Sequence, residues 1–289
     1  MTLTGTFTAL VTPFNTDGSV DYSALRSLVQ WQIENGVDGL VPVGTTGESP
    51  TLEIEEHIKV INATVEAAAG KAVIIAGTGA NSTSEAIALT REVLNAGVAA
   101  TLQVTPYYNK PNAEGLYRHF SSVADLGLPV VLYNVPGRAG KEIPLETVVR
   151  LASHPNVAAI KEAAGSVDRV SAIRNACELQ VLSGDDSLAL PMISVGACGV
   201  ISVASNVIPK EMSTLVRLAL ANDLIGAREL HRAYYPLFRD LFIDTNPIPV
   251  KTALSLMSRI GATFRLPLCE PSEKIREQLV RTLRSLNLL

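Results

Sequence analysis

One lysine of the sequence stands where an amine can act as a nucleophile. Lys161 follows the apolar run Val157-Ala158-Ala159-Ile160, which predicts a strand buried on both faces, and no other lysine ends a predicted strand. Burial favours the neutral amine, the form that attacks a carbonyl carbon to give an imine. The alternative is an ion pair at the strand end with a carboxylate such as Glu162. Lys161 therefore predicts either imine chemistry on a small oxo compound or a structural ion pair.

Hydroxyl, phenol and guanidinium groups follow other predicted strands. Thr45 and Thr46 lie in a glycine-flanked turn that can hold a carboxylate, or that can simply connect a strand to a helix. Tyr108 and Tyr133 can move protons beside an imine, or they can be packing residues. Arg138 can bind a carboxylate through two parallel N–H donors, or it can be a solvated surface residue. Taken singly, each residue leaves both interpretations open.

Bringing these groups together requires strands whose ends meet. Short apolar runs alternate with amphipathic stretches, as expected of repeated βα units around a parallel sheet. The predicted strands are residues 6–11, 39–43, 72–76, 100–104, 130–133, 157–161, 180–183 and 199–203. The predicted helices are residues 22–35, 52–69, 84–95, 113–126, 145–152, 167–175, 187–195 and 210–221. Eight such units predict a (β/α)8 TIM barrel, in which catalytic groups lie at the C-terminal ends of strands; a doubly wound α/β sheet is the alternative.

The rest of the chain predicts helices only. Three helical patterns after residue 221 are separated by TNPIP and LPLCEP, without a convincing strand. A chain of 289 residues, 47% of them hydrophobic, can bury one large core. We therefore predict a catalytic barrel over residues 1–221 and a C-terminal helical region over residues 222–289.

Composition argues against several classes of protein. The net charge is −4 and the basic residues are scattered, so neither nucleic acid nor a membrane surface is an expected partner. The first residues, MTLTGTFTALVTPF, carry no early basic residue and no long apolar run, which predicts a cytoplasmic protein. Three widely spaced cysteines fit reduced thiols, and four histidines without paired-ligand spacing predict no metal site.

Six motifs follow the predicted strands in order along the chain: GTTGES, TPYYN, YNVPGRAG, IKEA, SGDD and GVISV. In this order and at this spacing, over essentially the whole chain, they resemble the dihydrodipicolinate synthase and N-acetylneuraminate lyase family of class I aldolases. NPIPVK, in the C-terminal region, is similar to the synthase branch.

The resemblance implies a reaction and a set of catalytic residues. The reaction is the condensation of pyruvate with L-aspartate 4-semialdehyde to 4-hydroxy-tetrahydrodipicolinate, on the route to lysine and diaminopimelate. Lys161 would form the imine. Thr45, Tyr133 and Tyr108 would form a proton relay, with Tyr108 reaching into the site of a neighbouring subunit.

The resemblance also implies how the substrates are bound. Thr46 would bind the pyruvate carboxylate, and Arg138 would hold the carboxylate of the semialdehyde. Gly184 and Ile201 would supply backbone carbonyls near the imine. No cofactor is implied, and the family's assembly would make the protein a homotetramer, a dimer of tight dimers.

Two features favour the synthase over a retro-aldolase for sialic acid or a 2-keto-3-deoxy sugar acid. A second substrate with a carboxylate needs a cation such as Arg138. The neuraminate lyase branch usually carries serine in place of Thr45. A barrel that has lost catalysis and serves as a ligand-binding or interaction protein is a third hypothesis, because a fold does not guarantee activity.

L-lysine is a further partner that the resemblance implies, as a feedback inhibitor bound at the tight-dimer interface. The residues that match that regulatory site are Ser49, His57, Asn81, Glu85 and Tyr107. Pro50 and Ile54 depart from it, since strongly regulated bacterial enzymes carry alanine and histidine there. Ile54 removes a polar partner for the ligand.

Overall fold

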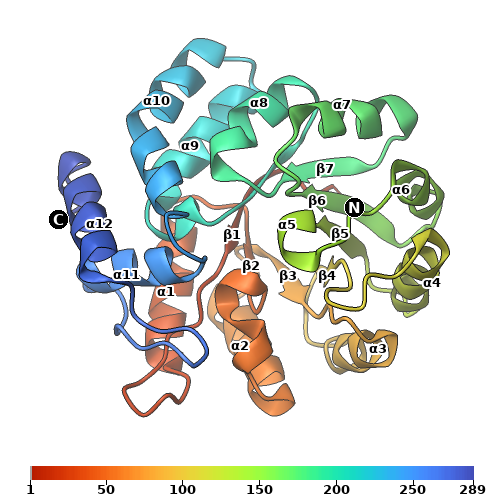
Figure 1. Cartoon of the computed structure of the whole chain (residues 1–289), viewed down its shortest axis with the longest axis horizontal. Helices are drawn as coiled ribbons and strands as arrows, with labels where there is room; N and C mark the ends of the chain where they lie inside the picture. Colours follow the sequence, from red (N-terminus) through yellow and green to blue (C-terminus); the bar gives the residue numbers. More distant parts are fainter. Residues whose placement is uncertain (1) are drawn as a thin grey trace.

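Eight parallel strands form a closed barrel in the computed structural model, which describes residues 2–289 (Figure 1). The strands are β1 (Gly5–Ala9), β2 (Gly39–Val41), β3 (Val73–Gly77), β4 (Ala100–Val104), β5 (Val130–Asn134), β6 (Val157–Glu162), β7 (Gln180–Ser183) and β8 (Gly199–Ser202). Each strand pairs with its neighbours in chain order, and β8 closes the barrel on β1. The predicted (β/α)8 fold is confirmed, and the alternative of a doubly wound sheet is wrong.

All the predicted strands are present, and their bounds differ from prediction by at most two residues. β1 ends at Ala9 instead of residue 11, and β2 ends at Val41 instead of residue 43. The early end of β2 has a local cause. Pro42 has no backbone N–H for the sheet, and Val43 has a φ of 56°, in the left-handed region that a strand cannot use. The chain therefore leaves the barrel early here and starts the threonine turn.

The helices surround the barrel in the order expected of βα units. They are α1 (Tyr22–Glu34), α2 (Ile54–Ala68), α3 (Thr83–Glu92), α4 (Ala113–Ala124), α6 (Leu145–Ala152), α7 (Val167–Ala176), α8 (Ala189–Ser194) and α9 (Pro209–Leu220). Their apolar faces pack on the outside of the strands in one continuous core. The start of α1 is fixed by Asp21, whose carboxylate accepts a hydrogen bond from the Ala24 N–H at 2.9 Å.

Short helical turns follow several strands at their C-terminal ends, where the sequence predicted either loops or the start of a long helix. A short helix α5 (Pro136–Ala139) follows β5, and 3₁₀ turns follow β2, β7 and β8. The turns are Thr45–Gly47, Ser49–Thr51, Asp186–Leu188 and Ala204–Asn206. The helix predicted over residues 52–69 consequently begins at Ile54, and the one predicted over 187–195 is divided between a 3₁₀ turn and α8.

Three helices follow the barrel, as predicted. They are α10 (Leu224–Asp240), α11 (Ile248–Leu256) and α12 (Glu273–Ser285). Figure 1 shows them in blue along one side of the barrel, beside α1 and α9. The division of the chain into a catalytic barrel over residues 1–221 and a helical region over 222–289 stays a prediction.

Residues 2–289 lack two features, a membrane-spanning helix and a metal-binding cluster. No helix among them has both the length and the apolar character needed to cross a membrane. No group of three or more histidine, cysteine or acidic side chains in this part of the chain is arranged to hold a metal ion.

Candidate active site

The barrel brings Lys161 and Tyr133 together at the C-terminal ends of neighbouring strands. Lys161 of β6 is in register with Tyr133 of β5, and the Lys161 Nζ lies 4.1 Å from the centre of the tyrosine ring. The lysine is only 6% exposed, so the buried strand end that the sequence predicted is confirmed. An amine in this position is shielded from bulk water and has a phenol as its neighbour.

Glu162 is not the partner of Lys161, and the ion pair considered for these two residues is wrong. Successive side chains of a strand point to opposite faces, so Glu162 points away from Lys161 toward the helices. The Asn134 Nδ2 donates to both Glu162 carboxylate oxygens, at 2.9 and 3.0 Å, and the Ala164 N–H donates at 2.9 Å. The cation nearest to this carboxylate is Arg169, whose Nε lies 3.7 Å away.

Burial raises the pKa of Glu162 from 4.5 to about 7, against the opposing effect of the hydrogen bonds from Asn134. The folded protein thus holds this proton more tightly than the unfolded chain. The contribution of Glu162 to the free energy of unfolding is fully present below about pH 4.5 and is lost as the pH rises to about 7. The free energy of unfolding falls by about 3 kcal/mol over this range. We expect the thermal transition of the wild type to fall, relative to that of Glu162→Gln, between about pH 5 and about pH 8.

Glu114 is the matched control for that measurement. Hydrogen bonds from Arg150 and Arg118 lower the pKa of its exposed carboxyl. Its contribution to stability is therefore lost as the pH falls, so Glu114→Gln should change the pH dependence with the opposite sign. A difference between wild type and Glu162→Gln that does not vary with pH would contradict the prediction.

Asp186 ties the end of β7 to the end of β8. Its fully buried carboxylate accepts hydrogen bonds from the Ser202 hydroxyl at 2.5 Å and from the backbone N–H groups of Val203 and Ala204 at 3.1 and 2.9 Å. Burial raises the pKa of Asp186 to about 6, while these bonds oppose the rise. The carboxylate fixes the backbone that follows Ile201, one of the two residues predicted to supply a backbone carbonyl near the imine.

Gly184, the other residue predicted to supply a backbone carbonyl, lies where the chain passes close to β6. A Cβ at this position would be 2.5 Å from the Ala163 Cβ, and the Gly184 N–H donates to the Glu162 carbonyl at 2.7 Å. The next residue, Asp185, is within electrostatic range of Lys161. Burial raises the pKa of Asp185, and the positive charge of Lys161 opposes the rise.

The threonine turn lies at the end of β2. Its shape is held by backbone hydrogen bonds from Gly47 to the Gly44 carbonyl and from Glu48 to the Thr45 carbonyl, at 3.0 and 3.1 Å. Thr46 is buried, and its hydroxyl accepts a hydrogen bond from the Asn246 Nδ2 at 3.0 Å. A hydroxyl that accepts this bond keeps its own proton for another acceptor, such as a substrate carboxylate.

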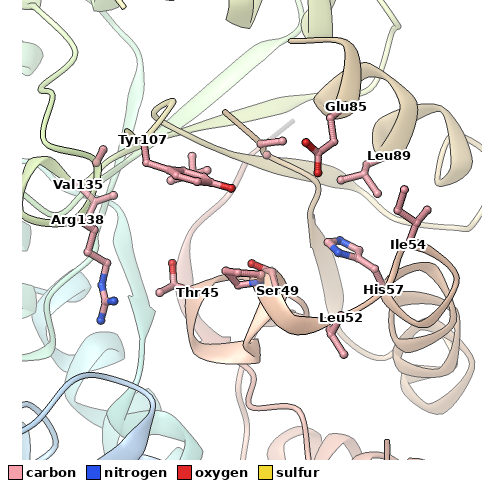
Figure 2. A pocket seen from close by; sticks show the side chains of 15 residues that line it. Thr45, Ser49, Leu52, Ile54, His57, Glu85, Leu89, Tyr107, Val135 and Arg138 are labelled. Carbon is pink, nitrogen blue, oxygen red and sulfur yellow. The ribbon is translucent and has the colours of Figure 1, made fainter. Parts of the chain in front are cut away.

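A cavity of about 360 Å³ opens beside this turn. Figure 2 shows Thr45 in the middle of the view, Arg138 and Val135 on one side, and Glu85, Leu89, Ile54 and His57 on the other. Thr45 also lines a second, smaller cavity of about 30 Å³, together with Tyr133. Among the predicted catalytic residues, Thr45 is the one that lines both cavities.

Arg138 lies on α5 and lines the large cavity. One terminal nitrogen, Nη2, donates to the Asn246 carbonyl at 2.9 Å. The far end of its loop is held at Ile143, whose N–H donates to the Asn134 Oδ1 at 3.0 Å and whose carbonyl accepts from Arg169 at 2.5 Å. Arg138 is an exposed residue, and the guanidinium N–H groups that do not bind Asn246 are suited to a carboxylate.

Four of the predicted regulatory residues, Ser49, His57, Glu85 and Tyr107, line the same cavity. His57 and Glu85 lie at the end away from Arg138, and Ser49 and Tyr107 lie between the two ends (Figure 2). The remaining one, Asn81, donates to the Tyr107 carbonyl at 3.3 Å.

The polar groups at this end are not all open to a ligand. The buried His57 donates its Nε2–H to the Gly77 carbonyl at 2.6 Å, and burial lowers its pKa, so the ring is neutral. Ile54, which departs from the regulated enzymes, is 60% exposed and lines the cavity.

Tyr108 is the predicted catalytic residue that the single chain does not bring to the site. It is 91% exposed, has a φ of 71°, and lines neither cavity. Its side chain is therefore open to solvent in the single chain.

Sequence reasoning missed several residues that hold the site in place. Asn246 contacts both Thr46 and Arg138, while Asn134 and Arg169 support the Arg138 loop. The only signal for Asn246 was its place in the motif NPIPVK, which by itself indicated no role.

Comparison with known proteins gives one consistent result. The model of the dihydrodipicolinate synthetase family matches residues 2–286. The chain is 51% identical to the 4-hydroxy-tetrahydrodipicolinate synthase of Nitratidesulfovibrio vulgaris, over 97% of each chain. A dihydrodipicolinate synthase from Acinetobacter baumannii, solved with pyruvate, matches with a TM-score of 0.98 and 46% identity over 100% of both chains. The enzyme from Cyanidioschyzon merolae, solved with lysine bound, matches with a TM-score of 0.96 and 40% identity over 99% of both.

Proposed function

The chain belongs to the dihydrodipicolinate synthetase family, and we propose that Lys161 is the residue on which it forms its pyruvate imine. The protein is a lyase that condenses pyruvate with L-aspartate 4-semialdehyde through a lysine Schiff base. The product is 4-hydroxy-tetrahydrodipicolinate, in the biosynthesis of lysine and diaminopimelate. The observation that supports Lys161 is its buried position at the end of β6, in register with Tyr133.

The reaction begins at the Lys161 Nζ. The neutral amine attacks the keto carbon of pyruvate, a carbon–nitrogen bond forms, and the keto oxygen leaves as water after two proton transfers. Loss of a methyl proton then gives an enamine, whose carbon attacks the aldehyde of the semialdehyde and forms the new carbon–carbon bond. Lys161 is released when the amino group of the second substrate displaces it.

The proton transfers are assigned to Thr45, Tyr133 and Tyr108. Tyr133 stands next to the reacting amine of Lys161, and Thr45 lines a cavity together with Tyr133. Tyr108 completes the relay in the site of a neighbouring subunit, which its exposed position supports. We accordingly propose a homotetramer built as a dimer of tight dimers.

A cytoplasmic location fits the three unpaired cysteines.

The substrate carboxylates are assigned to two different elements. The Thr46 hydroxyl donates a hydrogen bond to the pyruvate carboxylate, since the same hydroxyl already accepts a hydrogen bond from Asn246. Arg138 binds the carboxylate of the semialdehyde with the N–H groups that Asn246 does not use. Gly184 and Ile201 present backbone carbonyls toward the imine.

Borohydride reduction in the presence of pyruvate tests the assignment of Lys161. The reduced imine is a stable secondary amine, so mass spectrometry should find the added mass on the peptide that contains Lys161. A label on another lysine, or no label, would contradict the proposal that Lys161 forms the imine. A turnover assay with L-aspartate 4-semialdehyde and with sugar aldehydes then separates the synthase from the retro-aldolases.

L-lysine is proposed as an inhibitor that binds at the far end of the large cavity. The Glu85 carboxylate and the Ser49 hydroxyl can contact its charged groups, while Ile54 offers no hydrogen bond. We expect L-lysine to lower the rate and raise the thermal transition. Ile54→His should lower the half-inhibiting concentration about tenfold, the worth of one charge-assisted hydrogen bond. If saturating L-lysine changes neither the rate nor the thermal transition, the proposal is wrong. Lys59→Ala is the control variant, because Lys59 lies outside the cavity and its replacement should leave inhibition by L-lysine unchanged.

A further inference from the structure

Two cations of the C-terminal region are packed against the segment that carries the threonine turn. Lys251 of α11 donates to the Glu48 Oε1, across 203 positions of sequence. Arg265 donates to both carboxylate oxygens of Glu56 at 2.7 Å and to the Thr51 carbonyl at 2.7 Å. The C-terminal region thus contacts this segment at both the turn and the start of α2.

The pair of Glu48 and Lys251 is completely buried, with both side chains 0% exposed. The Lys251 Nζ lies 4.3 Å from the centre of the Phe14 ring and 5.0 Å from that of Phe264. The second Glu48 oxygen, Oε2, accepts from the Arg265 N–H at 3.4 Å. Removing two charges from water is costly, and an apolar pair of similar size is often as stable. Global stability is therefore a poor explanation for these charges.

The backbone of Glu48 shows what the pair holds in place. Glu48 directly follows Thr45-Thr46-Gly47, and its φ of 56° and ψ of 37° lie in the left-handed region, which is strained for a side chain of this size. Its N–H donates to the Thr45 carbonyl at 3.1 Å and closes the turn. If Glu48 relaxed to an ordinary conformation, that bond would break and both threonines would move.

We propose that Glu48 and Lys251 are positioning residues, which hold the Thr45–Thr46 turn in the shape that receives the pyruvate carboxylate. The inference rests on the proposed function, because it gives this turn its ligand. Neither side chain touches the substrate; the buried ion pair acts through the backbone of Glu48. Asn246, two residues before α11, supports the same turn through the Thr46 hydroxyl.

Single and double substitutions separate positioning from stability. Lys251→Met and Glu48→Gln each leave one buried charge or polar group without its partner, so both should lower the thermal transition. Both should also raise the pyruvate concentration that half-saturates borohydride trapping about tenfold, as expected for a weakened hydrogen bond to the carboxylate. In the double variant Glu48→Gln/Lys251→Met the thermal transition should recover while the pyruvate requirement stays raised.

Two further variants complete the design. Glu48→Asp keeps both charges but moves the carboxylate by one methylene, so it should fold and still raise the pyruvate requirement. Arg276→Gln removes an exposed ion pair with Glu273 on α12 and should change neither quantity. The Michaelis constant for the semialdehyde should change less than that for pyruvate, because the Arg138 loop is also held at Ile143.

The outcomes distinguish the inference from the proposed function. If the double variant and Glu48→Asp both bind pyruvate as the wild type does, the pair has no positioning role and the inference is overturned. If the pyruvate requirement of the double variant recovers together with its thermal transition, the role is structural and the inference is likewise overturned. If the wild type itself traps no pyruvate on Lys161, the proposed function fails instead.

Discussion

Replacing Lys161 by alanine should lower kcat/KM by about a thousandfold or more, because the reaction then has no amine on which to form the imine. The same variant should show no added mass after reduction with borohydride and pyruvate. The Lys161 Nζ lies over the Tyr133 ring, so the variant also removes a buried contact, and its fold must be checked by its thermal transition.

Lys161→Arg separates the chemistry from the packing. The guanidinium keeps a positive charge beside Tyr133 but stays protonated, so it cannot serve as the nucleophile. It should be as inactive as Lys161→Ala. Lys59→Ala is the matched control, since the Lys59 Nζ also lies over a tyrosine ring, 4.7 Å from the centre of Tyr22, but on the outside of the barrel. Near-normal turnover by both Lys161 variants would remove this lysine from the mechanism.

Replacing Arg138 by alanine should lower kcat/KM for L-aspartate 4-semialdehyde by about a hundredfold, equivalent to about 3 kcal/mol for a charge-assisted pair of hydrogen bonds. Trapping of the pyruvate imine should change little, because Thr46, and not Arg138, is assigned to the pyruvate carboxylate. Steady-state rates with each substrate varied in turn, combined with the trapping assay, measure the two effects separately.

Arg138→Lys tests whether the planar fork matters as well as the charge. Lysine restores the cation without the two parallel donors, so only part of the lost activity should return. Arg118→Ala is the control, because Arg118 is an exposed residue whose partner, Glu114, lies away from the cavity. If Arg138→Ala mainly lowers trapping of the pyruvate imine, Arg138 binds pyruvate and not the semialdehyde. Unchanged use of the semialdehyde would mean that another group binds its carboxylate.

The order of elements could be predicted because each strand and helix has a pattern of neighbouring residues that identifies it. Strands buried on both faces give short apolar runs, such as the one before Lys161, and amphipathic helices separate them. The exact ends of elements were less certain. β2 ends early, before Pro42 and Val43, since Pro42 lacks a backbone N–H and Val43 takes a left-handed φ.

The ion pair between Lys161 and Glu162 was an avoidable error. Side chains alternate along a strand, so adjacent residues of β6 must point to opposite faces whatever the rest of the fold does. The same rule predicts that Lys161 shares its face with Ala159, inside the barrel. Applied to the sequence alone, the rule excludes Glu162 as the partner of Lys161.

By itself, the sequence determined the barrel, the family and the strand ends that carry Lys161, Tyr133, Thr45 and Arg138, because these depend on local patterns and on motifs in order. Only the tertiary structure decided what holds them. Asn246 meets Thr46 across 200 positions and Lys251 meets Glu48 across 203, and no local pattern encodes contacts at that separation. They form because the helices after the barrel return to β2, which places buried donors and charges beside the turn.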